Sequence, residues 1–286
     1  ESYVFSSNDF GIPQLRNRIF FIGIRNDLDI HPNKIYFKLH KIIEKVKSNS
    51  KVNLGDAIYD LPQIISNPKP NNYRSKNEIP FKNRNSFGMN ISSEKYSDII
   101  DIKKSNSYVK KINTFKGKIM FLDFLYNHKS RYNNLRDKHI FKYLKEGLYL
   151  NHPDNFKALN GDGKIMKNGE EFKGIDYVKN YDENGNKIAS SFSDKYFKLN
   201  SKDNSKTIIA HLETDGNSYV HPPIEKNKNN LKYARSITPR EAARIQSFPD
   251  WYKFEGNLRN QFRQIGNAVP PLLAYEIGKE LKNVLK

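Results

Sequence analysis

The sequence predicts an α/β protein, with the end of a sheet and its covering helices joined to a smaller, irregular, β-rich region. Residues 18–24 (RIFFIGI) are apolar after Arg18 and rich in β-branched and aromatic side chains. This pattern is typical of a strand covered on both faces in a parallel or mixed sheet. Residues 271–285 carry Leu and Ile at four-residue spacing, which predicts an amphipathic helix. Between these segments, turn residues separate short apolar stretches.

The start of the chain predicts two strands. The stretch Tyr3–Phe5 is the first, and a turn at Gly11–Pro13 precedes the strand at 18–24. A strand covered on both faces needs neighbouring strands and helices, and little upstream sequence exists to supply them. The chain also begins with Glu1 rather than methionine. We therefore expect that a large part of the parent domain is missing here or lies on another chain.

Three later segments have helical patterns. Residues 35–46 have the apolar spacing of an amphipathic helix. Residues 52–62 (VNLGDAIYDLP) predict a short helical turn that Pro62 ends. Residues 131–146 predict a helix with apolar positions on one face, and Gly147 is placed to end it.

Two long stretches of the chain outside these helices are irregular. Residues 63–107 are polar and interrupted by prolines, so we expect a loop with little regular structure. Residues 151–235 predict short strands joined by tight turns. The turn at 182–187 (DENGNK) has the first spacings of a calcium loop but lacks its glycine and its closing glutamate, so a hairpin turn is the better interpretation. The GDG at 161–163 likewise predicts a turn rather than a phosphate-binding loop.

The last 50 residues have the most regular pattern. Thr238 is a natural N-cap, and Glu241 completes a capping box for a short helix that Pro249 ends. Gly266–Asn267 predicts a turn before a final helix that starts at Pro270–Pro271. Because glycine has no side chain, the backbone at this turn could approach a ligand closely.

The chain is strongly basic. Lysine and arginine number 49 against 31 acidic residues, which gives a formal net charge of +18. One explanation is a lysine- and asparagine-rich composition with solvated faces. The other is a polyanionic partner, because basic side chains release counterions when they bind nucleic-acid phosphates.

The sequence contains no cysteine, so it has neither a disulfide nor a thiolate metal site. His211 and His221 lack a third ligand in register, and we expect no metal site. No segment is long and apolar enough to cross a membrane, and no signal peptide is visible. We expect a cytoplasmic protein.

Three segments resemble motifs eight, nine and ten of the DNA (cytosine-5) methyltransferases, in the order of that family. They are residues 10–23 (FGIPQLRNRIFFIG), 238–250 (TPREAARIQSFPD) and 264–271 (QIGNAVPP). The long variable stretch between the first two matches the position of the family's target-recognition domain. Shorter resemblances occur at 56–62, 127–132 and 207–222, so the similarity extends over essentially the whole chain.

The resemblance implies a two-domain enzyme, commonly part of a restriction–modification system. A Rossmann-like methyltransferase domain would bind S-adenosyl-L-methionine, and a smaller irregular domain would bind double-stranded DNA. The target cytosine is flipped out of the helix, because its C5 atom is out of reach within the stack. A cysteine thiolate then attacks C6, a glutamate binds N3, and C5 accepts the methyl group. We assign residues 1–30 and 262–286 to the catalytic domain and 31–261 to the target-recognition domain with its connecting segments.

The resemblance also implies roles for residues of the eighth motif. Arg18 would lie near O2 of the flipped cytosine and stabilise charge that moves onto the ring. Gln14 and Arg16 would hold this pocket together. The alternative is that Arg16 and Arg18 form an ion-paired strand end.

Four further residues are assigned by the same resemblance. Asn267 and Ala268 would lie beside the methyl donor. Thr207 and Ile208 resemble a pair in the recognition domain that lies at the DNA.

The chain lacks several features of the family. It has no Pro-Cys loop, no glycine-rich donor motif and no Glu-Asn-Val. We therefore expect it to be inactive alone, as the C-terminal part of a longer enzyme or as one subunit of a split enzyme; the missing initiator methionine favours the first. A non-catalytic DNA-binding or specificity subunit remains the main alternative, and a tRNA-methylating relative is a lesser one.

Overall fold

The structure is a computed structural model. It describes residues 2–28, 30–31, 33–47, 51–66, 104–120, 125–150, 152, 154–155, 164–167, 170–173 and 195–285. In this part of the chain the fold is mixed α/β, and each of its four sheets has two strands. None of the described helices is long and apolar enough to cross a membrane.

An antiparallel ribbon forms the start of the chain. Strand β1 (Ser2–Ser6) pairs with β3 (Asn17–Phe21), so that Val4 lies opposite Ile19 and Phe5 opposite Arg18. A 3-10 helix, η1 (Ser7–Phe10), and the short strand β2 (Gln14–Leu15) connect them. Strand β2 pairs in parallel with β8 (Ser205–Lys206), which comes from the middle of the chain.

The prediction that the strand at 18–24 is covered on both faces is wrong for the described structure. On one face of the ribbon Phe5 is buried and contacts Phe20. On the other face Val4, Ile19 and Phe21 are 66%, 61% and 82% exposed. The β1–β3 ribbon is a two-stranded sheet, and the hydrophobic core packs against one of its faces. In the described chain no other element covers the second face, so its apolar side chains stay exposed.

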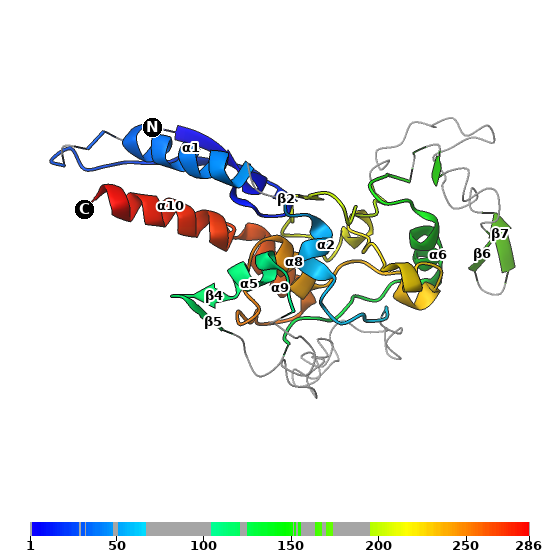
Figure 1. Cartoon of the computed structure of the whole chain (residues 1–286). Helices are drawn as coiled ribbons and strands as arrows, with labels where there is room; N and C mark the ends of the chain where they lie inside the picture. The colour runs from blue at the N-terminus through cyan, green and yellow to red at the C-terminus, as the bar shows by residue number, and fades with distance from the viewer. Residues whose placement is uncertain are drawn as a thin grey trace.

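Two long helices lie beside the ribbon at the end of the molecule that holds both termini (Figure 1). Helix α1 (Asn33–Lys47) matches the predicted helix at 35–46, and α10 (Pro271–Val284) starts where the double proline predicts. They pack on each other and on η1. Leu273 and Ile277 are buried on the predicted face of α10, whereas Leu285 is 55% exposed.

Four short helices form the centre of the molecule (Figure 1). They are α2 (Leu54–Ile58), α5 (Ser107–Ile112), α8 (Pro239–Ile245) and α9 (Leu258–Asn267). Each begins at a capping side chain, and both α2 and α8 have a complete capping box. Their apolar residues join those of η1, α1 and α10 in one hydrophobic core. The domain limits at 30 and 262 stay a prediction.

The predictions for the C-terminal region need two corrections. Gly266 and Asn267 do not form a turn but are the last residues of α9, whose cap Asn257 was not recognised. Helix α8 ends at Ile245, before Pro249. The cap and the buried Phe262 and Ile265 stabilise α9, although most of its other residues are polar.

The opposite end of the molecule is irregular (Figure 1). Helix α6 (Leu135–Tyr143) is shorter than the predicted 131–146 because Leu144 is extended, and its apolar residues form a second small core. Strands β4 (Thr114–Phe115) and β5 (Lys118–Ile119) lie beside α5 instead (Figure 1). The remaining short elements are β6 (Lys164–Lys167), β7 (Glu170–Lys173), η4 (Gly216–Ser218), η5 (Glu225–Asn227) and η6 (Leu231–Tyr233). Most of the predicted loop at 63–107 and the turns at 161–163 and 182–187 lie outside the described residues.

The two faces of the ribbon should respond differently to truncation. Phe5→Ala removes a side chain that is 2% exposed, and it should lower the free energy of unfolding by about 3–5 kcal/mol. Phe21→Ala, on the open face, should change it by less than about 0.5 kcal/mol. Urea unfolding of both variants measures this difference. Equal losses would show that both faces are covered.

Candidate functional site

Arg16 is buried at a junction of three chain segments. It lies between β2 and β3 and is 4% exposed. Its Nη1 donates a hydrogen bond to the carbonyl of Ile208 at 2.9 Å, and its Nη2 donates to the carbonyls of Gly266 at 2.9 Å and Ala268 at 3.3 Å. Burial, followed by the charge of Arg18, lowers the pKa of Arg16 to about 10. The side chain therefore remains a cation at neutral pH, and it joins the start of the chain to residues 208 and 266–268.

Gln14 completes the same junction. Its Oε1 accepts a hydrogen bond from the backbone N–H of Ile208 at 2.7 Å, so the side chains of Gln14 and Arg16 bind the N–H and the C=O of one residue. Gln246, in α8's C-terminal turn, donates to the carbonyls of Ile265 and Ala268. These backbone groups are therefore fixed from two sides.

Gly266 allows the backbones to approach each other closely. A Cβ atom at this position would lie 2.3 Å from the backbone nitrogen of Ala210, a distance that real Cβ atoms do not show. Thr207 is held as well, because its Oγ1 donates to the carbonyl of Leu15 at 2.6 Å and its own carbonyl accepts from the hydroxyl of Tyr219. Helix α9 and the segment that follows β8 therefore touch backbone to backbone.

The structure brings most of the predicted site residues together. Gln14, Arg16, Ile208 and Ala268 meet directly, and Thr207 is bound to the neighbouring Leu15. Asn267 is adjacent in sequence but exposed at the end of α9. The resemblance assigned these residues separately to the base pocket, the methyl donor and the DNA. It did not indicate that Arg16 binds three backbone carbonyls.

Arg18 is separate from this junction. Its side chain is exposed, and its Nη1 donates to the carbonyl of the adjacent Asn17 at 2.7 Å. Within the described residues neither Arg16 nor Arg18 forms a salt bridge. The alternative of an ion-paired strand end is therefore not what this part of the chain shows. The geometry leaves the guanidinium of Arg18 open to a ligand.

A buried charge network supports α8. Arg235 binds Glu241 through two hydrogen bonds of 2.8 and 2.6 Å, and both side chains are 1% exposed. The carboxylate of Glu241 also accepts from the backbone of Thr238, as the capping box predicts. His221 lies 3.4 Å from Glu241. The capping pattern predicts the cap but not the partner Arg235, which lies outside that pattern.

The two histidines of this network are neutral in the folded protein. Burial is the main cause that lowers the pKa of His128 to about 4 and that of His221 to about 3. His128 contacts Thr238 and the carbonyl of Pro62. Among the described residues, no group of three potential ligands could hold a metal ion.

A family model describes this chain over nearly its full length. The model for C-5 cytosine-specific DNA methylase matches residues 1–283. The chain belongs to the C-5 cytosine-specific DNA methylase family. The family resemblance seen in the three motifs is thereby confirmed.

Individual relatives of this methylase chain agree with the family. The type II methyltransferase M.Bpa9945I of Bacillus paralicheniformis is 30% identical over 99% of this chain and 51% of its own length. The type II methyltransferase M.DdeI of Desulfomicrobium norvegicum is 26% identical over 97% of this chain and 53% of its own length. Both relatives of this chain are therefore named as type II methyltransferases.

A solved structure shares the fold. It is described as a DNA modification methyltransferase encoded within a prophage (E. coli), with a TM-score of 0.52 at 20% identity, over 100% of this chain and 60% of that one. The methylase chain spans between 51% and 60% of the length of these relatives. The expectation that this chain is inactive alone, as part of a longer or split enzyme, stays a prediction.

The buried histidines predict a pH-dependent stability. Because the folded-state pKa values of His128 and His221 lie below the ordinary 6.5, the unfolded chain binds more protons than the folded chain between about pH 4 and 6.5. Stability should fall as pH decreases through this range, by about 1.4 kcal/mol per pH unit for each histidine. The lowered pKa of Glu241 adds a further loss below its ordinary value of 4.5.

Urea unfolding at several pH values measures this slope. His221→Gln removes one of the two titrating groups, so its slope near pH 5 should be smaller than that of the unsubstituted chain by about 1.4 kcal/mol per pH unit. Identical slopes would show that His221 is protonated in the folded state.

Proposed function

We propose that this chain serves the methylation of cytosine at C5 in double-stranded DNA, with S-adenosylmethionine as the methyl donor, in the bacterial cytoplasm. The observation that carries the proposal is the junction at Arg16. A single side chain binds the segment predicted to lie at the DNA and the segment predicted to lie beside the donor. A protein that only binds DNA has no need to fix these two segments to each other. The relation to DNA methylases favours DNA over tRNA as the substrate.

The chain offers groups that fit the proposed donor and the proposed base. The exposed carboxamide of Asn267 provides hydrogen-bonding groups for a polar ligand. S-adenosylmethionine, when bound, supplies an electrophilic methyl group. The exposed guanidinium of Arg18 would lie near O2 of the flipped cytosine, where a fixed cation stabilises the negative charge that a nucleophile transfers to the ring.

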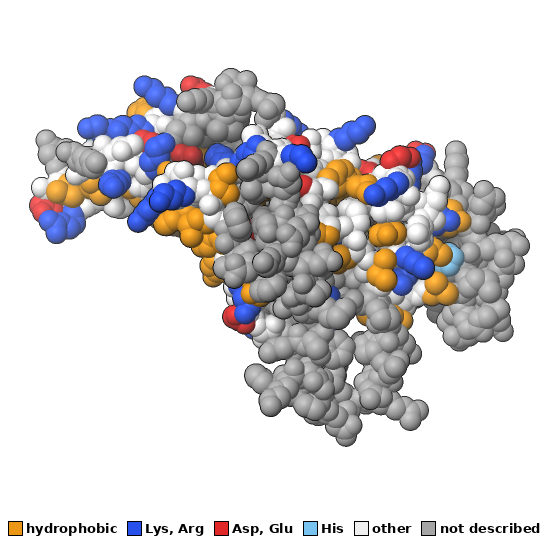
Figure 2. Space-filling model, turned by 60° about the horizontal axis from the view of Figure 1, so that its bottom comes forward, with side chains coloured by type: hydrophobic (Ala, Val, Ile, Leu, Met, Phe, Trp, Pro, Cys, Tyr) orange, Lys and Arg blue, Asp and Glu red, His pale blue; other side chains and the backbone are white. Residues whose placement is uncertain are grey.

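The nucleophile has to come from outside these residues. The family's reaction uses a cysteine thiolate, and the sequence contains no cysteine. We infer that a polypeptide segment with a Pro-Cys loop completes the site. A surface for it is the open face of the β1–β3 ribbon, where Val4, Ile19 and Phe21 are exposed together, because contiguous apolar surface marks an interaction site. Figure 2 shows apolar side chains, interspersed with Lys and Arg, near the end with α1 and α10 and also toward the opposite end.

The second candidate is a specificity subunit that binds DNA without taking part in the reaction. The net charge of +18 is consistent with either function. The coding sequence next to this one should contain a Pro-Cys loop if the first proposal is correct. The polypeptide that carries the loop is then the partner for activity measurements.

Arg18→Ala tests the catalytic proposal. Loss of one preorganised charge-stabilising donor costs about 3 kcal/mol in the barrier, so single-turnover methyl transfer with the Cys-bearing partner should slow by roughly a hundredfold or more. The melting temperature should not change measurably, because Arg18 is exposed and binds the adjacent backbone. Radiolabelled methyl donor and a duplex containing the methylation site measure the rate.

Arg25→Ala is the matched control, because Arg25 is an exposed cation of the same segment that pairs with Asp27. It should methylate at the rate of the unsubstituted chain. A normal single-turnover rate in folded Arg18→Ala would refute the role at the base. Failure of every Pro-Cys partner to restore methyl transfer would favour the non-catalytic subunit.

A further inference from the structure

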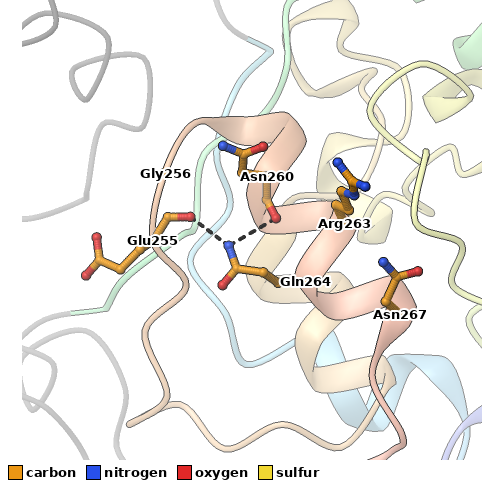
Figure 3. Close-up of a pocket in the computed structure, with 6 residues that line it drawn as sticks. All are labelled: Glu255, Gly256, Asn260, Arg263, Gln264 and Asn267. Atoms are coloured by element: carbon orange, nitrogen blue, oxygen red, sulfur yellow. Dashed lines mark hydrogen bonds between the residues drawn. The ribbon is translucent and has the colours of Figure 1, made fainter.

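The exposed face of α9 borders a hollow that has no assigned role. Its volume is about 490 Å³, and it is open to solvent. Figure 3 shows the residues that line it. Its walls combine the turn before α9 with one side of the helix, and the lining residues are Glu255, Gly256, Asn260, Arg263, Gln264 and Asn267. Positions 260, 263 and 267 follow the helical repeat and therefore lie on the same side of α9.

The charge in this hollow is positive. Arg263 is exposed, and no acidic side chain of the described residues pairs with it. The single acidic residue, Glu255, is ion-paired with Lys253 at 2.9 Å, and Figure 3 shows its carboxylate directed away from Arg263 and Asn267. The net effect is one uncompensated guanidinium.

The amide side chains divide into two groups. The side chain of Gln264 is already bound within the protein, because its Nε2 donates hydrogen bonds to the carbonyls of Glu255 at 2.8 Å and Asn260 at 3.1 Å. These two hydrogen bonds fix the turn against the helix. The carboxamides of Asn260 and Asn267 stand on either side of Arg263 along α9 (Figure 3). The carboxamide of Asn260 can donate an N–H group to the ligand that Arg263 binds.

The hollow lies beside the segment predicted to contact DNA. At one end of α9 the backbone of Gly266 touches Ile209 and Ala210, which follow Thr207 and Ile208. Near the other end, Arg259 Nε lies 3.7 Å from a carboxylate oxygen of Glu213. Helix α9 therefore runs along residues 209–213, and Arg263 lies between the two contacts. Arg263 is also one helical turn, about 6 Å, from Asn267.

We propose that this hollow holds a backbone phosphate of the DNA, beside residues 209–213. The inference rests on the proposed function and adds a subsite to it. A guanidinium binds a phosphodiester through two parallel hydrogen bonds, and neighbouring N–H donors complete its coordination. Contacts of this kind fix the register of a protein on the duplex but do not read its sequence. Arg263 thus positions the strand, whereas Arg18 acts on the base.

Duplex binding at several salt concentrations tests the proposal with the full chain. Each phosphate contact contributes about 0.9 to the slope of log affinity against log salt. For Arg263→Gln we expect a slope that is smaller by about one and an affinity that is roughly tenfold lower at 0.1 M salt, equally for unrelated duplex sequences. Fluorescence anisotropy of end-labelled duplexes measures both quantities.

Two further variants control for charge and for folding. Lys279→Gln removes one exposed positive charge from α10, outside the hollow, and should leave the slope unchanged. Arg263→Lys keeps the charge and should keep the slope, although it loses the paired geometry. Melting temperatures should be the same for all variants, because residues 263 and 279 are exposed.

The outcomes separate this inference from the proposed function. If the unsubstituted chain binds no duplex, the proposed function fails and the subsite fails with it. A second outcome is that the unsubstituted chain binds duplex DNA with the expected salt dependence while Arg263→Gln shows the same slope of log affinity against log salt as the unsubstituted chain and Lys279→Gln. That result refutes the subsite alone. If Arg263→Gln instead lowers affinity for S-adenosylmethionine in equilibrium dialysis and leaves the salt slope unchanged, the hollow binds the carboxylate of the donor, which overturns the phosphate assignment.

Discussion

A buried cation that binds only backbone carbonyls is the interaction on which this structure depends. Isolated buried charge is unfavourable in a protein interior, and it persists only where hydrogen bonds replace the lost water. Arg16 has no carboxylate partner in the described structure; the carbonyls of Ile208, Gly266 and Ala268 surround it instead. These groups come from segments more than 190 residues away in sequence from Arg16. The buried cation is therefore stabilised only when both distant segments are in place.

This constraint explains why other residues at the junction are small or polar. Gly266 has to lack a side chain, because the backbone of Ala210 occupies the space of a Cβ atom. Gln14 and Gln246 bind the remaining backbone groups of the same segments. Helix α9 is thereby held against residues 207–213, and its exposed face forms a wall beside them. The proposed roles at the base, the donor and the phosphate all depend on this fixed arrangement.

Local signals in the sequence predicted local structure well. The capping box at Thr238, the double proline at 270–271 and the apolar spacing at 35–46 each gave a helix near its observed position. These features stabilise a helix through neighbours in sequence, so they can be recognised without the fold. The candidate site was found through motif resemblance, and the structure brings most of its residues together.

Other features depend on contacts distant in sequence and were missed. The pattern at 18–24 is apolar on both faces, but whether a face is covered depends on neighbouring segments rather than on the strand itself. Helix α9 contains few apolar residues, and its packing becomes evident only where Phe262 and Ile265 enter the common core. The carbonyl partners of Arg16 and the ion pair of Arg235 with Glu241 likewise carry no sequence signal.

Replacement of Arg16 by methionine tests the dependence on this junction most directly, because methionine keeps much of the side-chain volume and removes every donor. The free energy of unfolding and the hydrogen exchange of the Ile208 amide can be measured on the same protein, with Arg18→Met as the exposed control. Each buried carbonyl left without a donor costs about 1–3 kcal/mol. Arg16→Met should therefore lose about 3 kcal/mol or more and expose the Ile208 amide to faster exchange, while Arg18→Met changes neither. An Arg16→Met variant with the stability and the Ile208 exchange rate of the unsubstituted chain would contradict the dependence of the structure on this cation.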